Sequence, residues 1–423
     1  MGESDTDDLF DLAEALISGS LPIEGHHPLQ VGGPTRTAAV TDDVMFVESF
    51  ANSVVVRTDD GLVMVDAGSP LHAAAIHDAV RAWSPAPLHT AVYTHGHVDH
   101  IYAIANFEAE SGASPARVIA HDAVPDRFRR YELTRGYNGI INQRQFQLGG
   151  PFFPGDYRYP DLTYRDTLDV EVGGTRFELR HDRGETDDGT WVWLPEHKVL
   201  CTGDLFIWAS PNCGNPQKVQ RYCDEWAIAL RKMAALGAEV LLPGHGLPIR
   251  GADRVRGALE DAAELLESLF TQTIALMNGG ARLDEIIHTV EAPAHLLERP
   301  WLQPVYDEPE FIVRNIWRLY GGWYGGNPAE LKPAAESAVA AELASLAGGA
   351  QVLADRALAV LAEGDERLAG HLAEMATLAA PDDPGVWRVR ATVFGQRAHS
   401  ERSTMAKGVF RWAENDSTAH TAL

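Results

Sequence analysis

The sequence predicts an α+β protein in which a β-rich first part is followed by an almost wholly helical second part. Short apolar runs rich in β-branched residues recur up to about residue 251 and then stop. After residue 255, apolar residues recur at helical spacing instead. The chain has 423 residues, of which 45% are hydrophobic, so it is long enough to form about two cores.

The β-rich part begins with a predicted hairpin. Two apolar runs lie between residues 44 and 68, and the turn sequence TDDG separates them. Residues 70–83 then follow a helical pattern, and residues 89–95 form a short buried strand. Further strands are predicted at residues 116–121, 175–181, 190–195, 198–204 and 238–245.

The helical part opens with a stripe of apolar residues, namely Leu259, Ala262, Leu266, Phe270 and Met277. Ala-rich helices follow residue 326 and are interrupted at residues 363–365 and 381–384. Ordinary helix packing explains these stripes, and one such pair of helices is too little to indicate a repeat array.

Composition and charge exclude several classes of function. The 60 acidic and 35 basic residues give a net charge of -25, which repels a phosphate backbone, so no nucleic acid partner is expected. The three cysteines form no CxxC pair and indicate neither a disulfide framework nor a thiolate zinc site. The acidic N-terminus is unlike a signal peptide, and no run approaches the ~20 apolar residues of a membrane span, so a cytoplasmic location is expected.

The sequence THGHVDH at residues 94–100 carries the chemistry. His95 and His97 are two residues apart, which on extended backbone places both imidazoles on one side. Asp99 and His100 follow as the chain turns, and they can address a second point nearby. Because this stretch follows a buried strand, it lies where functional loops of α/β layers collect, and it predicts a site for one or two metal ions.

Three further ligand-type residues follow apolar strands next to glycine. Glu185 lies in RGETDDG, Asp204 in VLCTGDL and His245 in LLPGHGLP. A lone histidine is more often structural than a ligand, so the inference rests on the whole set.

This set resembles the metallo-β-lactamase superfamily, whose fold is an αββα sandwich with a binuclear metal site at one edge of the sheets. The resemblance implies that Asp66, in VDAG, supports the site without binding metal. It implies one metal held by His95, His97 and Glu185, and another held by Asp99, His100 and His245. Asp204 and a hydroxide, the expected nucleophile, would bridge the two ions, and Asp99 is counted among the catalytic residues.

The Glu185 position separates two possible registers. Most superfamily members have GHT where this chain has Gly184-Glu185-Thr186, so the register places Glu185 in the ligand position and His181 outside it. A glutamate there is similar to the alkyl sulfatases, although these usually carry Glu at the Asp204 position.

The resemblance to the alkyl sulfatases extends over about residues 40 to 415. Residues 318–334 and the STMAKGVF sequence are similar to the start and end of that family's helical dimerisation domain. Tyr137, Gly139 and Arg144 match a YxGx4R pattern of that family. The resemblance therefore implies an alkyl-sulfatase-like hydrolase that forms a homodimer through its helical domain.

Two departures concern the substrate. The chain stops where the family usually continues into a lipid-carrier-like domain, and the stretch that carries the family's sulfate-binding Arg reads Asn215-Pro216-Gln217-Lys218-Val219 here. Two divalent ions, three carboxylates and one hydroxide sum to a neutral set, so an anionic substrate needs protein cations. Arg144, Lys218 and Arg221 are the candidates, and Tyr137 could assist the leaving group.

Hydrolysis of a small alkyl-sulfate-type ester is the predicted function, with two Zn²⁺ as cofactors and Mn²⁺ or Fe as alternatives. The same site could act on another ester, a thioester, a lactone or a phosphoester. More distant alternatives are a di-iron oxidase and a non-catalytic metal-binding dimer. The predicted domains are an N-terminal extension over residues 1–39, a catalytic domain over 40–252 and a helical dimerisation domain over 253–423.

Overall fold

The computed structural model describes residues 9–27, 29 and 32–421, and the chain forms two compact units. The first unit comprises the residues up to 135 together with 154–281 and 285–322. The second comprises 136–153, 282–284 and 323–423. The acidic first eight residues, on which the expectation about a signal peptide rested, lie outside the described residues.

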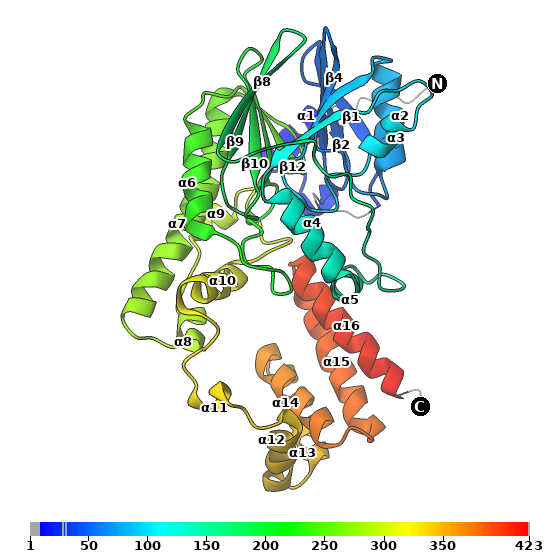
Figure 1. Cartoon of the computed structure of the whole chain (residues 1–423). Coiled ribbons are helices and arrows are strands. Elements are labelled where there is room, and N and C mark those ends of the chain that lie inside the picture. Colours follow the sequence, from blue (N-terminus) through cyan, green and yellow to red (C-terminus); the bar gives the residue numbers. More distant parts are fainter. Residues whose placement is uncertain (1–8, 28, 30–31, 422–423) are drawn as a thin grey trace. The chain divides into compact units, whose positions relative to one another are not determined.

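The first unit is built around two sheets that face each other, with helices on their outer sides (Figure 1). The seven strands of one sheet are in chain order: β1 (Arg36–Ala39), β2 (Val44–Glu48), β3 (Ser53–Thr58), β4 (Gly61–Val65), β5 (Leu88–Val92), β6 (Arg117–His121) and β7 (Leu162–Tyr164). The six strands of the other are, in spatial order, β13 (Ile249–Arg250), β12 (Val240–His245), β11 (Val199–Ile207), β10 (Thr190–Leu194), β9 (Thr175–His181) and β8 (Thr167–Val172). The αββα sandwich is therefore confirmed.

The hairpin predicted around TDDG is formed by β3 and β4, which pair from Thr58 opposite Gly61. The run before it differs from the prediction, because it is divided into β2 and β3 at residues 49–52. Asn52 lies in this break. Its side-chain amide donates to the carbonyls of Pro243 (3.0 Å), in β12 of the facing sheet, and Gly246 (2.9 Å), just after that strand. The two sheets are thus tied together beside His245.

Helices cover the outer faces of both sheets in the first unit. The first unit contains the helices α1 (Leu9–Ile17), α2 (Ala73–Trp83), α3 (Ile104–Glu108), α4 (Val124–Leu133), α6 (Cys223–Ala234), α7 (Ala252–Asn278), α9 (Ala294–Leu297) and α10 (Pro309–Gly321), and the 3₁₀ helix η1 (Ile23–His26). Of these, α9 and α10 pack on α7. On one side, α2 buries Ile76 and Val80 in a core shared with Met64 of β4. On the other side, α6 and α7 pack side by side (Figure 1).

The end of the first unit lies later in the chain than the predicted boundary after residue 252. Helix α7 buries Leu259 and Leu266 against the first unit and packs on α6, β12 and β13. Its apolar stripe therefore covers a sheet of the catalytic unit. At the N-terminus, α1 buries Leu9 and Phe10 in the same unit, so the predicted extension also contributes to this fold.

The second unit is helical, as predicted. It contains most of α5 (Arg135–Phe146), part of α8 (Leu283–Ile287), and α11 (Pro328–Leu331), α12 (Glu336–Ala347), α13 (Ala350–Ala362), α14 (Glu366–Ala379), α15 (Pro384–Ser400) and α16 (Thr404–Thr421). The predicted breaks at 363–365 and 381–384 separate α13 from α14 and α14 from α15.

Small residues let these helices approach closely. Ala354, Ala357, Ala369 and Ala373 are fully buried in one core of the second unit. A Cβ on Gly408 of α16 would lie 2.2 Å from the carbonyl oxygen of Gln145 on α5, so only glycine fits there. The Ala-rich composition therefore serves close helix packing.

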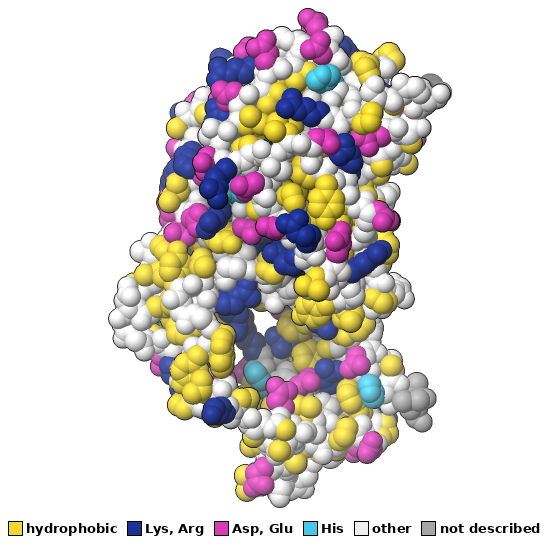
Figure 2. Space-filling view, in the orientation of Figure 1, with side chains coloured by type: hydrophobic (Ala, Val, Ile, Leu, Met, Phe, Trp, Pro, Cys, Tyr) yellow, Lys and Arg dark blue, Asp and Glu magenta, His cyan; other side chains and the backbone are white. Residues whose placement is uncertain are grey.

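Among the described residues, no single helix has the length and apolar character needed to cross a membrane. Helices α12 and α13 have that length and character only when they are taken together, and the angle between them is 85°. Acidic and basic side chains are interspersed over the face that Figure 2 shows.

Candidate metal centre

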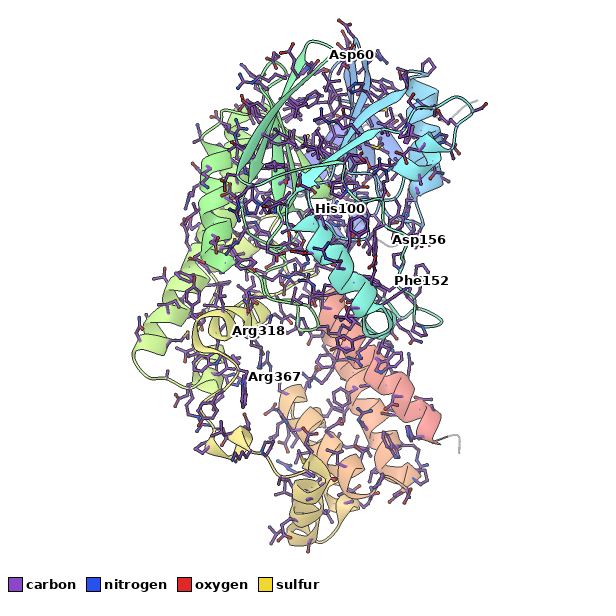
Figure 3. All side chains as sticks on the ribbon, in the orientation of Figure 1. Asp60, His100, Phe152, Asp156, Arg318 and Arg367 are labelled. Carbon is purple, nitrogen blue, oxygen red and sulfur yellow. The ribbon has the colours of Figure 1, made fainter. Side chains whose placement is uncertain are left out.

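Seven ligand-type side chains meet at one end of the two sheets of the first unit. In Figure 3, His100 marks this end, and Asp60, in the turn between β3 and β4, marks the opposite one. Four chain segments supply the set: the loop after β5, the loop between β9 and β10, strand β11 and the end of β12. The side chains are those predicted, namely His95, His97, Asp99, His100, Glu185, Asp204 and His245.

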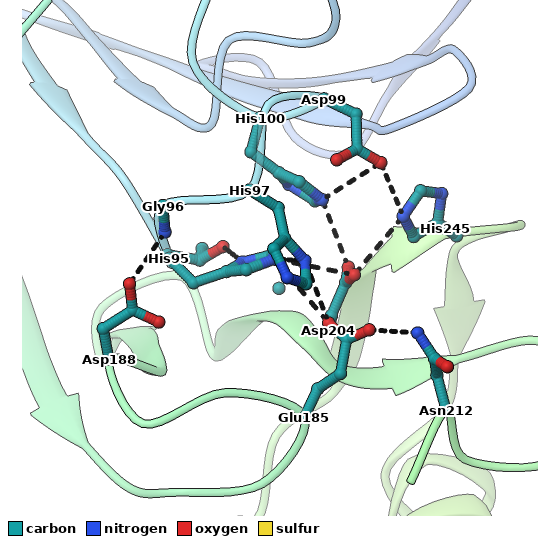
Figure 4. Close-up of polar contacts among 12 residues, drawn as sticks. His95, Gly96, His97, Asp99, His100, Glu185, Asp188, Asp204, Asn212 and His245 are labelled. Carbon is teal, nitrogen blue, oxygen red and sulfur yellow. Dashed lines mark hydrogen bonds and ion pairs between the residues drawn. The ribbon is translucent and has the colours of Figure 1, made fainter. Parts of the chain in front are cut away.

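The seven side chains form two groups (Figure 4). His95, His97, Glu185 and Asp204 make up the first group, and Asp99, His100 and His245 make up the second. Within each group, one ligand atom of every residue lies within 4.8 Å of those of the others.

Asp204 lies between the two groups. Its carboxylate is 3.7 Å from His95 Nε2, and 3.4 Å from both His100 Nε2 and His245 Nε2. A Cβ on Gly244 would lie 2.1 Å from Asp204 Oδ1, so the glycine next to His245 leaves room for the shared carboxylate. Asp204 is thus placed to bridge two ions.

The cluster fits a metal because three of its donor atoms are buried without a hydrogen-bond partner. Among the described residues, His100 Nε2, Glu185 Oε2 and Asp204 Oδ1 are buried and accept or donate no hydrogen bond. Burying polar atoms in this way is costly unless a cation joins them. Imidazole and carboxylate donors together suit zinc, manganese or iron.

Hydrogen bonds orient the ligand imidazoles. The Nδ1–H of His100 donates to Asp66 Oδ2 at 2.8 Å, which leaves Nε2 free to face the cluster. Thr94 donates to the same carboxylate oxygen at 2.7 Å, and its hydroxyl lies 3.0 Å from His95 Nδ1. His245 Nδ1 bonds to the carbonyl of Phe50. Asp66 therefore supports the site without joining the cluster, as predicted.

Burial and charge shift the histidine pKa values in opposite directions. Burial and the neighbouring His100 lower the pKa of His95 to about 3. Burial lowers the pKa of His97 as well, and Arg127 and Arg221 add to the effect. For His100, burial is outweighed by Asp204 and Asp66, which raise its pKa well above the ordinary value. The environment therefore favours neutral imidazoles at His95 and His97 and a protonated imidazole at His100.

Arg221 and Asn212 both contact Glu185. The guanidinium of Arg221 donates to the backbone carbonyl of Glu185 and lies 3.2 Å from its Oε1, while the Asn212 amide donates to the same Oε1. Burial raises the pKa of the Glu185 carboxyl to about 7, and Arg221 opposes this rise.

The role predicted for Arg221 as a substrate-binding surface cation does not fit this position, because the side chain is 2% exposed and paired with Glu185. Lys218 is half-buried nearby, and burial together with Arg221 lowers its pKa to about 8. The sequence did not indicate Asn212, since an asparagine in a loop carries no signal for such a contact.

Three residues considered from the sequence lie outside the cluster. His181 stacks on His121, with ring centroids 3.7 Å apart, and its Nδ1 faces the carbonyl of Gly189 at 2.8 Å. The register that placed Glu185 in the ligand position therefore agrees with the geometry. Tyr137 and Arg144 lie on the part of α5 that belongs to the second unit, and their roles stay predictions.

Residues 47–245 match the metallo-beta-lactamase superfamily, and residues 282–419 match the alkyl sulfatase dimerisation family. The chain joins a metallo-beta-lactamase domain to an alkyl sulfatase dimerisation domain. The sec-alkylsulfatase Pisa1 from Pseudomonas sp. has the same fold, with a TM-score of 0.80 and 23% identity over 92% of this chain and 65% of that one.

Curated relatives include alkylsulfatases. A linear primary-alkylsulfatase of Pseudomonas sp. is 27% identical, over 80% of this chain and 69% of its own length. An (R)-specific secondary-alkylsulfatase of Pseudomonas sp. is 25% identical, over 85% of this chain and 59% of its own length. The 2,4-dinitroanisole O-demethylase subunit alpha of Nocardioides sp. is 21% identical, over 73% of this chain and 85% of that protein. The chain thus spans 69% of the primary-alkylsulfatase and 59% of the secondary-alkylsulfatase.

Proposed function

We propose that this protein is a binuclear metal-dependent hydrolase of sulfate esters of the alkyl sulfate type. The observation that carries the proposal is the convergence of seven ligand-type side chains in two groups that share Asp204. The matched domains and the alkylsulfatase relatives support the reaction class.

The residues divide the work as follows. His95, His97 and Glu185 would hold one ion, Asp99, His100 and His245 the other, and Asp204 both. Divalent ions in such a site, with zinc the expected one, lower the pKa of a water and polarise the ester. Asp66 and Thr94 keep the imidazoles in the orientation that binding requires, and Arg221 keeps the Glu185 carboxylate in place.

Positive charge for a sulfate group has to come from outside the cluster. Arg221 is committed to Glu185, so Lys218 is the nearer candidate in the first unit. Arg144 remains the candidate indicated by the sequence in the second unit.

A second candidate function is cleavage of an aryl methyl ether or of an ester other than a sulfate. It is favoured by the 2,4-dinitroanisole O-demethylase subunit, of which the chain spans 85%. The stretch Asn215-Pro216-Gln217-Lys218-Val219 also favours a substrate without a sulfate group, because the sulfate-binding Arg of the alkyl sulfatases is not evident there.

One panel separates these candidates. Metal-replete protein is incubated with a linear primary alkyl sulfate, a secondary alkyl sulfate, 2,4-dinitroanisole, a thioester and a lactone. Release of inorganic sulfate that stops on chelation and returns with Zn²⁺ supports the sulfatase. Turnover of 2,4-dinitroanisole with inert alkyl sulfates would replace it with the second candidate.

We also propose a homodimer formed through the second unit. Exposed apolar side chains at Val339, Leu343 and Leu346 follow one face of α12, a pattern that a partner surface would cover. Replacing all three by Glu should convert a dimer to a monomer in light scattering. A wild-type monomer at micromolar concentration would contradict the proposal.

A further inference from the structure

A buried ion pair lies beneath the loop that carries His95 and His97. Arg127, on α4, and Asp188, in the loop between β9 and β10, are 2% and 0% exposed. Arg127 Nε donates to Asp188 Oδ2 at 2.6 Å, and its other end donates to the Asp187 carboxylate. Because taking two charges out of water usually offsets their attraction, such a pair is weak evidence for a role in stability alone.

The same carboxylate oxygen holds the backbone between the two histidine ligands. The amide of Gly96 donates to Asp188 Oδ2 at 3.1 Å. A Cβ at Gly96 would lie 2.9 Å from Arg127 Cδ and 3.2 Å from Asp188 Oδ2. The glycine of THGHVDH therefore lets the loop pack directly on the ion pair.

Asp188 also belongs to the loop that carries Glu185, three residues earlier. One carboxylate thus joins the two loops that supply His95, His97 and Glu185. The ligands of the second group have other supports, since His100 bonds to Asp66 and His245 to the Phe50 carbonyl. The ion pair acts on one group of ligands and not on the other.

We propose that Arg127 and Asp188 are positioning residues that set the metal affinity of the first group. Asp188 fixes the spacing between the two loops, and Arg127 fixes Asp188. The inference rests on the proposed function only in that the cluster binds two ions, and it does not depend on the substrate.

The test is an equilibrium titration of metal-free protein with Zn²⁺ against a chromophoric chelator. The variant is Arg127→Met with Asp188→Ala, because removing both charges leaves no unpaired buried ion. We expect one equivalent, the one that Glu185→Ala removes, to lose about 10- to 100-fold in affinity, the usual effect of removing a group that orients a metal ligand. The other equivalent should keep its wild-type Kd.

Two comparisons make the outcome specific. A Glu185→Ala protein should lack the ion of the first group. In that background the same double change should leave the Kd of the remaining ion unaltered, because the first group no longer binds an ion whose ligands the pair could position. Arg158→Met is the matched control: this half-buried arginine pairs with Glu108 and Asp161 in the same unit, and its loss should leave both ions bound as in wild type.

Three outcomes would overturn the inference. If the double variant folds and binds both ions with wild-type affinity, the ion pair has a structural role only. Equal weakening of both ions contradicts its restriction to one group. Wild-type protein that binds fewer than two ions overturns the proposed function, and this inference with it. A single Arg127→Lys change, which keeps a positive charge beside Asp188, should retain most of the wild-type affinity.

Discussion

The two groups of ligands in the cluster are held in different ways. The first group depends on buried arginines, since Arg221 bonds to Glu185 and Arg127 to the Asp188 that holds Gly96. The second group depends on hydrogen-bond acceptors, because the Asp66 carboxylate orients His100 and the Phe50 carbonyl orients His245.

The difference teaches that two metal positions of similar donors can differ in electrostatic support. Arginines lower the pKa of His97, in addition to burial, whereas carboxylates raise that of His100 against burial.

The largest expected effect is at Glu185, the one carboxylate that belongs to the first group alone. Glu185→Ala should remove one metal equivalent and nearly all turnover, measured by elemental analysis and a hydrolysis assay. His181→Ala is the control, and it should keep both metals because His181 lies against His121. The reverse pattern would reject the register on which the ligand set rests.

Asp66 tests the support that the two groups share. Asp66→Ala removes the acceptor of His100 Nδ1–H and of the Thr94 hydroxyl, which lies beside His95. The affinity for the second ion should therefore fall by about 10- to 100-fold, and that for the first ion should fall as well. The measurement is the same Zn²⁺ titration. Unchanged affinity would show that packing alone orients His100.

A smaller effect is expected from Arg144, because Arg221 is occupied by Glu185 and an anionic substrate needs other cations. A charge-assisted hydrogen bond contributes about 1.5 to 3 kcal/mol, so Arg144→Ala should lower kcat/KM for an alkyl sulfate at least about tenfold with metal content intact. Arg356→Ala, which removes an exposed ion pair with Glu363, is the control. Unaltered turnover together with inert alkyl sulfates would remove sulfate esters as the substrate class.

The smallest effect concerns a buried acid near Arg221. Burial raises the pKa of Asp307 to about 7, although the amides of Gly214 (2.5 Å) and Glu308 (2.8 Å) donate to it. A carboxyl with a raised folded-state pKa destabilises the fold as pH rises from its unfolded value, about 4, through 7. The difference in Tm between Asp307→Asn and wild type should therefore shift in favour of the variant as pH rises from 5 to 8. A constant difference across that range would contradict the shift.

The sequence was sufficient to predict which seven side chains come together, because each lies in or just after the end of an apolar strand, and strand ends gather at one edge of a sheet. It also predicted the hairpin around TDDG and the breaks between α13, α14 and α15, where Gly and Pro interrupt helical patterns.

The sequence was not sufficient for contacts between distant segments. The stripe on α7 is the same whether the helix covers a sheet or builds its own domain, so the boundary after residue 252 fell too early. Arg221 was predicted as a candidate cation for the substrate because its burial depends on Glu185, a residue 36 positions away. Arg127, Asp188 and Asn212 carry no local pattern at all.

The metal-to-protein ratio of the wild-type chain tests the central claim most directly. Protein is stripped with a chelator, reconstituted with excess Zn²⁺, freed of unbound metal and analysed for zinc and for amino-acid content. Two groups that share Asp204 predict two zinc ions per chain. A ratio of one or less would contradict a binuclear centre.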